Sequence, residues 1–124
     1  MNAEQRQKGI AKFEEVMGFS PPDVDDLFLN VTLDHLFPNV WARGGLSRRE
    51  RRLITLTAIV CLGHEPTLKL HLGAATKSGD LSDEDIDELI LHIAHYAGWP
   101  AASLGNSVAR KLRAERDQQP DVGP

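Results

Sequence analysis

The chain has 124 residues, 41% of them hydrophobic and 26% charged, which is the composition of one soluble globular domain. A net charge of −4 argues against a surface built as a whole for nucleic acid or for an anionic membrane. Cys61 is the only cysteine, so an intrachain disulfide, a C-x-x-C redox pair and a cysteine-based zinc site are excluded. The polar N-terminus lacks the apolar segment of a signal peptide and no stretch is apolar enough to cross a bilayer, so we expect a cytoplasmic protein.

The first half of the chain is predicted to be helical. Residues 4–17 carry apolar side chains at helical spacing, and a second helix is expected to begin after the prolines at 21 and 22. We expect Pro38 to interrupt this second helix, because proline lacks a backbone N–H and clashes with the preceding turn. Ser47 and Glu50 then have the S-x-x-E spacing of a capping box and predict the start of a helix.

The helix predicted over residues 48–62 is apolar on nearly every side beyond its charged first turn. Such a helix needs cover all round, and a chain of this size has little surface to provide it, so we expect oligomerisation. The basic run at its start is interrupted by Glu50 and is interpreted as a solvated or salt-bridged face rather than a nucleic-acid patch.

Helix signals continue to the C-terminal region. Gly63 and Pro66 separate the apolar helix from the next one, Ser82 opens a strongly amphipathic helix, and a last helix is expected over 101–116. No segment alternates like a strand. The predicted fold is therefore all-α, a single compact domain of about six helices over residues 1–117, followed by a disordered tail over 118–124.

The stretch GHEPTLKLH, residues 63–71, holds the first candidate site. With Pro66 at the first helical position, the backbone N–H groups of Thr67 and Leu68 would be free to hold an anion. Glu65 is interpreted either as the cap of this helix or as part of the site. His71 shares a face with Thr67 at the edge of the apolar stripe, where it is either a structural, partly buried histidine or a catalytic one.

The amphipathic helix after Ser82 holds the second group of candidates. His92 and Tyr96 are four residues apart and flank the apolar stripe, where they either line a pocket or satisfy buried polar groups. His95 points nearly opposite the stripe and is expected at the surface or at a subunit contact. His92 and His95 have the i, i+3 spacing of metal ligands on a helix, but no acid or third histidine lies beside them in the sequence. His64 and His71 lack such a spacing, so no metal is expected.

Residues 37–102, FPNVWARGGLSRRERRLITLTAIVCLGHEPTLKLHLGAATKSGDLSDEDIDELILHIAHYAGWPAA, resemble the carboxymuconolactone decarboxylase family. The resemblance is carried by W-x-R before GLS, by an arginine in the next turn, by L-I-T leading into the apolar helix that ends in LG, by L-x-x-H and by HYAGWPAA. It implies an all-helical fold like that of alkylhydroperoxidase D, assembled into trimers or hexamers with active sites near subunit contacts. The activity it implies is decarboxylation of 4-carboxymuconolactone to an enol-lactone, without a cofactor, in aromatic catabolism through β-ketoadipate.

The sister branch of peroxidases uses a C-x-x-C-x-x-x-H motif, whose cysteine positions fall on His64 and Thr67 here, with His71 retained. Without thiols at these positions peroxidase chemistry is not expected. The chain also departs from the decarboxylase pattern at four positions, which are Gly44, Arg52, His64 and His95. We still expect the fold of the family despite these departures, whereas the identity of the substrate stays open.

The resulting hypothesis is a carboxy-lyase acting on a small carboxylated lactone. His71 is the expected general acid and base, Glu65 would orient a histidine, and His64 would bind a carboxylate or oxyanion. The expected substrate-binding residues are Arg43 and Arg51 as carboxylate clamps, the helix start at Thr67, and the pocket walls Trp41, His92 and Tyr96. A lactone isomerase or hydrolase using the same histidine, and a non-catalytic helical oligomer that binds a small molecule, are the alternatives.

Overall fold

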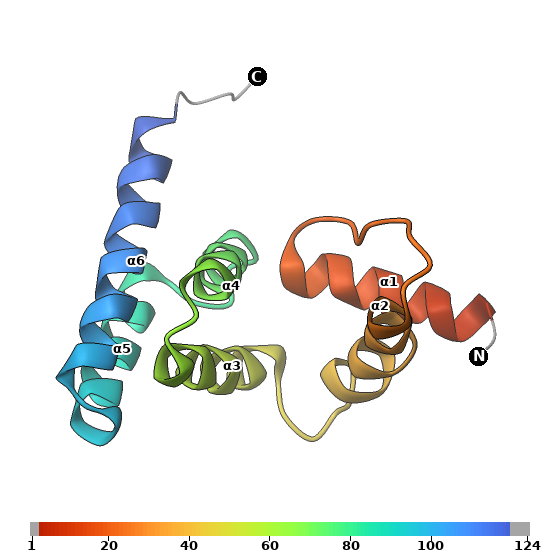
Figure 1. Ribbon diagram of the computed structural model, residues 1–124, viewed down its shortest axis with the longest axis horizontal. Helices are drawn as coiled ribbons and strands as arrows, with labels where there is room; N and C mark the ends of the chain where they lie inside the picture. The colour runs from red at the N-terminus through yellow and green to blue at the C-terminus, as the bar shows by residue number, and fades with distance from the viewer. Residues whose placement is uncertain (1–2, 120–124) are drawn as a thin grey trace.

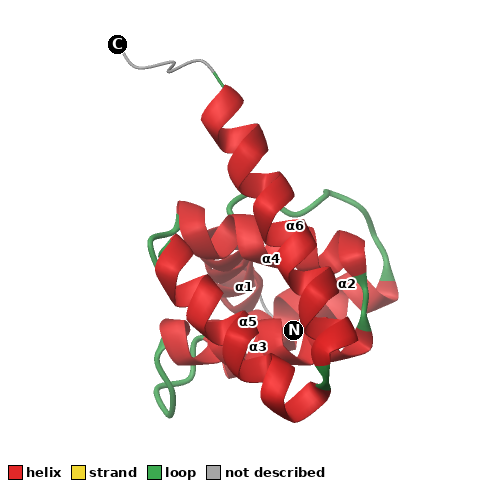
Figure 2. Ribbon diagram, turned by 90° about the vertical axis from the view of Figure 1, so that its left-hand side faces the viewer, coloured by secondary structure: helices red, strands yellow, loops and turns green. Residues whose placement is uncertain are grey.

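The computed structural model describes residues 3–119, and in this range it is built from helices alone (Figure 2). The elements are α1 (Ala3–Met17), α2 (Leu27–Val31), the π-helix η1 (Thr32–Trp41), α3 (Arg48–Leu62), α4 (Glu65–Lys77), α5 (Asp83–Ala97) and α6 (Trp99–Gln118). The predicted all-α fold is confirmed. The tail predicted over 118–124 begins inside α6 at Gln118, and residues 120–124 of it lie outside the described residues.

Two hydrophobic cores organise the described chain. The helices α1, α2 and η1 lie together at one end (Figure 1), around Phe13, Val16, Leu33, Phe37 and Trp41. The helices α3 to α6 enclose the larger core, and α4 also contacts α1. The last turns of α6 project beyond the bundle (Figure 2). His71 lies on α4, the helix that touches both groups.

Gly9 allows α1 to cross η1 at very close range. A Cβ atom built on Gly9 would lie 1.5 Å from the backbone oxygen of Leu33, so any side chain there would overlap with the π-helix. The same crossing holds an ion pair, in which the guanidinium of Arg6 donates from Nη2 to Asp34 Oδ2 at 2.8 Å. The buried carboxylate of Asp34 is therefore neutralised within the N-terminal core.

The expected interruption at Pro38 is wrong. The chain continues in helical form from α2 through η1 to Trp41, with Pro38 inside the π-helix. The wider turn of a π-helix pairs each N–H with a carbonyl five residues earlier, as Ala42 does with Phe37 at 3.1 Å. We attribute the tolerance of Pro38 to this wider turn, because it moves the preceding carbonyl away from the proline ring.

The predicted helix ends are confirmed at α3 and α5. Both start with a complete capping box, Ser47 with Glu50 and Ser82 with Asp85. Gly63 ends α3 with φ at 70°, a left-handed conformation that glycine adopts without strain. These ends fix the loop lengths, and so the way in which α3 and α4 lie side by side.

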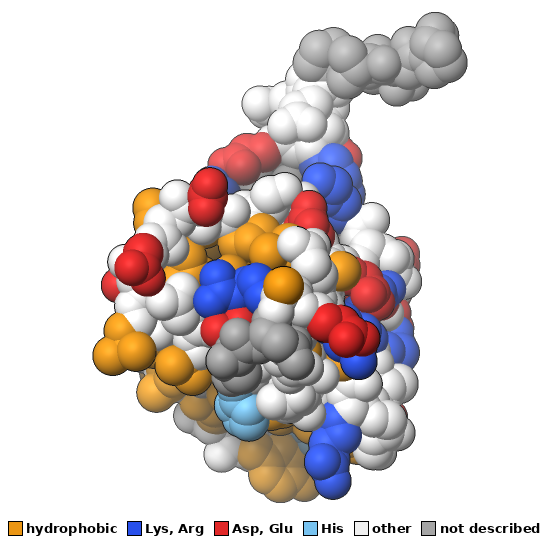
Figure 3. Space-filling view, turned by 90° about the vertical axis from the view of Figure 1, so that its right-hand side faces the viewer, with side chains coloured by type: hydrophobic (Ala, Val, Ile, Leu, Met, Phe, Trp, Pro, Cys, Tyr) orange, Lys and Arg blue, Asp and Glu red, His pale blue; other side chains and the backbone are white. Residues whose placement is uncertain are grey.

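The apolar helix α3 is only partly covered within one chain. Leu56, Ile59 and Val60 are buried, whereas Ile54 is 57% exposed and Leu62 is 80% exposed. Large apolar side chains also reach the surface elsewhere, with Phe28 on α2 82% exposed. Figure 3, which faces the α1 end of the molecule, shows such apolar side chains among the charged ones. Uncovered apolar side chains of this size are typical of association surfaces.

Among the described residues, no helix has both the length and the apolar character required to span a membrane.

Candidate active site

His71 lies half-buried on α4, one helical turn after Thr67. Its Nδ1 atom is buried and makes no hydrogen bond within the described part of the chain. Burial lowers the pKa of His71 below its ordinary value of 6.5, and the nearby positive charge of Arg52 lowers it further. The imidazole is therefore held in its neutral form at pH 7, with an unused ring nitrogen.

The start of α4 is closed by its own side chains, so the expectation of two free backbone donors is wrong. The N-cap is His64, whose Nδ1 accepts from the backbone N–H of Thr67 at 3.4 Å and lies 2.5 Å from Thr67 Oγ1. The N–H of Leu68 donates to the carbonyl of His64 at 3.0 Å. Pro66 lies one residue later than expected, because Glu65 is the first helical residue. An anion at this helix start would have to displace the cap.

Glu65 is exposed and lies 3.7 Å from Lys111 of α6. It does not cap the helix, since His64 does. Among the described contacts of Glu65 none reaches a histidine. This carboxylate therefore serves as part of a surface ion pair between α4 and α6, and its expected role in orienting a histidine has no support in the structure.

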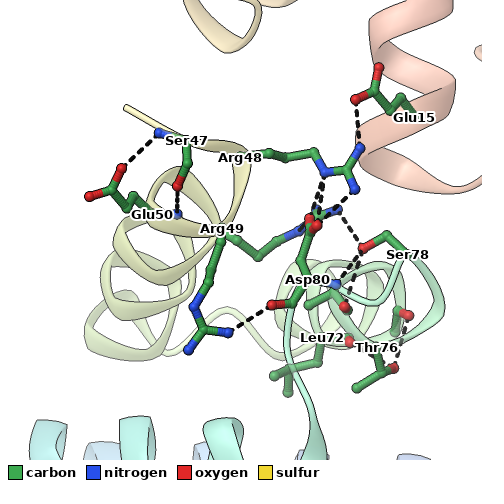
Figure 4. Close-up of polar contacts among 12 residues, drawn as sticks. Glu15, Ser47, Arg48, Arg49, Glu50, Leu72, Thr76, Ser78 and Asp80 are labelled. Carbon is green, nitrogen blue, oxygen red and sulfur yellow. Dashed lines mark hydrogen bonds and ion pairs between the residues drawn. The ribbon is translucent and has the colours of Figure 1, made fainter. Parts of the chain in front are cut away.

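A partly buried cluster of arginines surrounds Asp80 (Figure 4). Asp80, in the loop after α4, accepts three hydrogen bonds of 2.8 to 2.9 Å from the guanidinium of Arg48. Its Oδ2 also accepts from Arg52 Nε at 3.2 Å. Figure 4 shows Arg48 reaching from α3 both to Asp80 and to Glu15 of α1. The basic run at the start of α3 is thus a salt-bridged face, as predicted.

Arg52 is the most unusual member of this cluster, because its side chain is completely buried. Its guanidinium carbon lies 5.8 Å from the centroid of the Trp41 ring, at a distance typical of a cation–π contact. Its Nη2 lies 3.5 Å from the hydroxyl of Ser78, and its Nη1 has no partner in the described chain. The Trp41 ring is itself buried and stacks on Phe37, so Trp41 belongs to the N-terminal core and contacts the site through Arg52.

Arg51 and Arg43 are joined to each other. Arg51 donates from Nη2 to the backbone carbonyl of Arg43 at 3.1 Å, while its buried Nε has no partner in the described chain. The side chain of Arg43 lies exposed in the loop before α3. The loop therefore holds the guanidinium of Arg51 in one orientation, while its buried Nε lacks an acceptor among the described residues.

His92 and Tyr96 lie apart from the cluster of arginines around Asp80. They stack on each other with ring centroids 5.0 Å apart on the exposed side of α5, and Tyr96 is 83% exposed. The helix α5 packs on α6 and α3, while α4 packs on α3, α6 and α1. His95 is exposed as expected, edge-on to Trp99 at 5.7 Å. Within one chain the structure does not bring His92 or Tyr96 to His71.

Two surface hollows lie along α6. One of about 440 Å³ separates α4, α5 and α6, with Leu72, Ile86 and Leu112 at its apolar side and Arg113 and Arg116 at its polar side. The other, of about 320 Å³, lies between α5 and the start of α6. His71 lines neither hollow. Both apolar and charged side chains line the first hollow, whereas small-molecule pockets are lined mainly by apolar side chains.

Within residues 3–119 no three histidine, cysteine or acidic side chains are grouped as metal ligands. The chemistry that the described groups support is proton transfer by His71 and binding of a negative charge by arginine. Sequence reasoning missed Asp80 and the burial of Arg52. The position of Arg52 was readable, because it lies four residues before Leu56 on the buried face of α3.

Comparison with known proteins identifies the family of this chain. The family model described as the carboxymuconolactone decarboxylase family matches residues 26–111. A relative named 4-carboxymuconolactone decarboxylase, from Acinetobacter baylyi, is 36% identical over 121 residues, with 90% of each chain covered.

Two further relatives cover less of the chain. A nitrosuccinic acid decarboxylase from Metarhizium robertsii is 36% identical over 72 residues, covering 58% of this chain and 50% of its own. An uncharacterized 15.0 kDa protein from Paracoccus denitrificans is 29% identical over 89 residues, covering 70% of this chain and 66% of its own. Two of the three relatives thus carry decarboxylase in their names.

Proposed function

The chain belongs to the carboxymuconolactone decarboxylase family, and from this membership we propose that it is a cofactor-free carboxy-lyase. Its proposed substrate is 4-carboxymuconolactone or a closely related carboxylated lactone, in the cytoplasmic breakdown of aromatic compounds through β-ketoadipate. The relative that bears this substrate in its name aligns with nearly the whole chain, which supports the proposal.

The reaction needs one proton and the stabilisation of one developing charge. Loss of CO₂ breaks a carbon–carbon bond and leaves its electron pair on a dienolate that extends to the conjugated carbonyl oxygen. The dienolate then takes up a proton on carbon. The observation that carries the proposal is the half-buried imidazole of His71, whose buried Nδ1 has no partner in the described chain. A histidine in such surroundings relays a proton at neutral pH.

Arg51 is the proposed holder of the substrate carboxylate. Its guanidinium is held at Nη2 by the carbonyl of Arg43, so little side-chain freedom is lost when a carboxylate binds. The exposed side chain of Arg43 adds a second positive charge at the loop. His64 and Glu65 enter the proposal only as residues that hold the start of α4.

We further propose that the site is completed in a homotrimer or homohexamer. The supporting observations are the exposed apolar side chains of α2 and α3 and the exposed His92–Tyr96 stack, which lines neither of the two hollows along α6. Association would remove these side chains from water and bring the stack to a subunit contact. Sedimentation that shows a monomer at every protein concentration would contradict this part of the proposal.

The test is an assay of substrate classes with the purified protein and no added cofactor. The panel contains 4-carboxymuconolactone, the same lactone without its carboxyl group, and nitrosuccinic acid, the compound named in the name of one relative. CO₂ release is measured separately from opening of the lactone ring. Release of CO₂ from the carboxylated lactone supports the proposal, ring opening alone favours an isomerase or hydrolase, and tight binding without turnover favours a non-catalytic binder.

A further inference from the structure

The short helix α2 carries a row of exposed apolar side chains. Leu27, Phe28 and Val31 lie on α2 and Val24 precedes it, and each of the four is at least 52% exposed. Leu27 and Val31 share one face, because they are four residues apart on a helix. We call these four residues the α2 stripe. Large apolar side chains that are gathered in this way, rather than scattered singly, mark a surface that binds another molecule.

The helix α3 carries a second row of exposed side chains, which we call the α3 stripe. Its members recur at helical spacing and share one face of the helix, and they are Ile54, Ala58, Cys61 and Leu62. The helix α2 belongs to the N-terminal group and α3 to the larger group (Figure 1). Since both stripes are exposed, neither covers the other within one chain.

The two stripes are bordered by opposite charges. Three exposed aspartates that form no ion pair in the described part of the chain lie beside the α2 stripe, and they are Asp23, Asp25 and Asp26. The α3 stripe begins next to positive charge, because Ile54 lies one helical turn after Arg51, which is joined to the exposed Arg43. Neither arginine has an ion-pair partner among the described residues. The stripes therefore match in charge as well as in apolar character.

Other surfaces of the chain fit the α2 stripe less well. Two copies of α2 that face each other would bring their aspartates together without a positive charge between them. The exposed side of α5 carries the apolar Leu91, but Glu84 and Glu88 lie on the same face and repel the aspartates. The helix α3, by contrast, combines an exposed apolar stripe with arginines that lack an ion pair.

We propose that the α2 stripe of one copy binds the α3 stripe of a second copy, with the aspartates next to Arg43. The inference rests on the proposed function in one respect, since it assigns the interface of the proposed homo-oligomer. A contact between two different surfaces is heterologous, and its repetition about a rotation axis closes a ring of subunits. Because Ile54 and Arg51 are one helical turn apart, α2 of the second copy lies beside the proposed carboxylate holder and forms one wall of the site.

The first experiment mixes two disrupted proteins. The α2 variant carries Leu27→Ser and Phe28→Ser, and the α3 variant carries Ile54→Ser and Leu62→Ser. Analytical ultracentrifugation measures the subunit concentration needed for assembly, which we expect to rise at least about tenfold in each variant alone. The α2 variant retains the α3 stripe and the α3 variant retains the α2 stripe. An equimolar mixture is therefore expected to form a dimer that contains one copy of each.

The matched control is Leu70→Ser, which replaces an exposed leucine of α4 outside both stripes and is expected to assemble like the wild type. The replaced side chains are exposed, so the variants are expected to fold, and circular dichroism checks each of them. A mixture that stays monomeric overturns the inference. Wild-type assembly of the α3 variant alone would indicate that α2 binds α2, and a wild type that is monomeric at every concentration would leave the stripes to a different protein. Either result also overturns the inference, as does dissociation of Leu70→Ser to a monomer.

The second experiment tests the charges at the interface. Salt screens attraction between exposed groups, so raising the concentration of sodium chloride is expected to weaken assembly of the wild type. We expect a smaller effect of salt on the variant with Asp23→Asn and Asp25→Asn, since it has lost two of the attracting charges. An equal effect of salt on both proteins overturns the pairing of the aspartates with the arginines, and with it the choice of α3.

The third experiment separates the interface from the proposed function. At concentrations where each variant alone is monomeric, CO₂ release from 4-carboxymuconolactone is expected to be lost and to return in the mixture, because each mixed dimer holds one complete site. A mixed dimer without turnover, while the wild type is active, overturns the role of α2 as a wall of the site. Absence of CO₂ release in the wild type, with the mixed dimer still formed, instead contradicts the proposed function and leaves the interface standing.

Discussion

Replacing Asp80 with asparagine removes the one carboxylate that Arg48 and Arg52 share. Asparagine keeps the shape and one acceptor oxygen but leaves the charge of Arg52 buried and unpaired. Breaking a buried pair in this way costs about 3–5 kcal/mol, and we expect the lower end of that range because an acceptor remains. Since small domains are stable by about 5–15 kcal/mol, the variant is expected to lose a large part of its free energy of unfolding.

Urea unfolding followed by circular dichroism, at one fixed subunit concentration, measures this loss. The matched control is Asp87→Asn, which breaks an ion pair between Arg113 and an exposed carboxylate and is expected to cost at most about 1 kcal/mol. Adding Arg52→Met to Asp80→Asn removes the unpaired charge and should restore part of the loss. A cost for Asp80→Asn no larger than that of the control would refute the argument that Asp80 neutralises a buried arginine.

The pH dependence of this effect follows from the pKa of Asp80. Burial by itself raises that pKa, but the hydrogen bonds and charge of Arg48 and the charge of Arg52 outweigh burial, so the pKa lies below its ordinary value of 3.8. The stabilisation by Asp80 is therefore fully present above pH 3.8 and is lost as the pH falls through the lower value of the folded protein. The difference between the wild type and Asp80→Asn should narrow in acid, and a constant difference down to the lowest accessible pH would contradict this assignment.

Four further substitutions test the fold and the pKa of His71. Gly9→Ala is expected to lower the free energy of unfolding by about 3 kcal/mol or more, because its Cβ overlaps with the backbone of η1. In Gly73→Ala on α4 the new Cβ meets no atom within 4 Å, so this variant should be more stable by about 0.5–1 kcal/mol in urea unfolding. Ser47→Ala removes the capping box of α3 and should lower the free energy of unfolding by about 1 kcal/mol. A variant as stable as the wild type would contradict the contribution of this cap. Because folding lowers the pKa of His71, the unfolded chain takes up a proton at this residue before the folded protein does as the pH drops below 6.5. Acidification should therefore lower the melting temperature of the wild type more than that of His71→Gln. An equal decrease in both proteins would refute the lowered pKa.

The helix pattern was predictable from local signals, because helix ends are set by the residues at the ends. Ser47 and Ser82 cap α3 and α5 as their sequences indicate, and Gly63 ends α3 in the conformation that glycine favours. Pro38 misled the prediction, since proline breaks an α-helix but is accommodated in the wider π-helix. No feature of the sequence around Pro38 distinguishes a broken α-helix from a continuous π-helix.

The candidate site was only partly predictable, because it depends on contacts between distant segments. The position of His71 at the edge of a buried face followed from helical spacing, and the structure confirms that the side chain is half-buried. The cap by His64 and the sharing of Asp80 by two arginines depend on side-chain geometry that spacing does not specify. His92 and Tyr96 share a face as their spacing requires, but that face is exposed in the single chain.

The central claim is that the imidazole of His71 transfers the proton in a decarboxylation. The most direct measurement is the initial rate of CO₂ release from 4-carboxymuconolactone by the wild type, by His71→Gln and by His35→Gln, whose side chain is exposed on η1 and contacts Asn39. We expect His71→Gln to lower kcat by about 10²-fold or more, with an unchanged assembly state, and His35→Gln to retain the wild-type rate. Wild-type turnover in His71→Gln would contradict the claim.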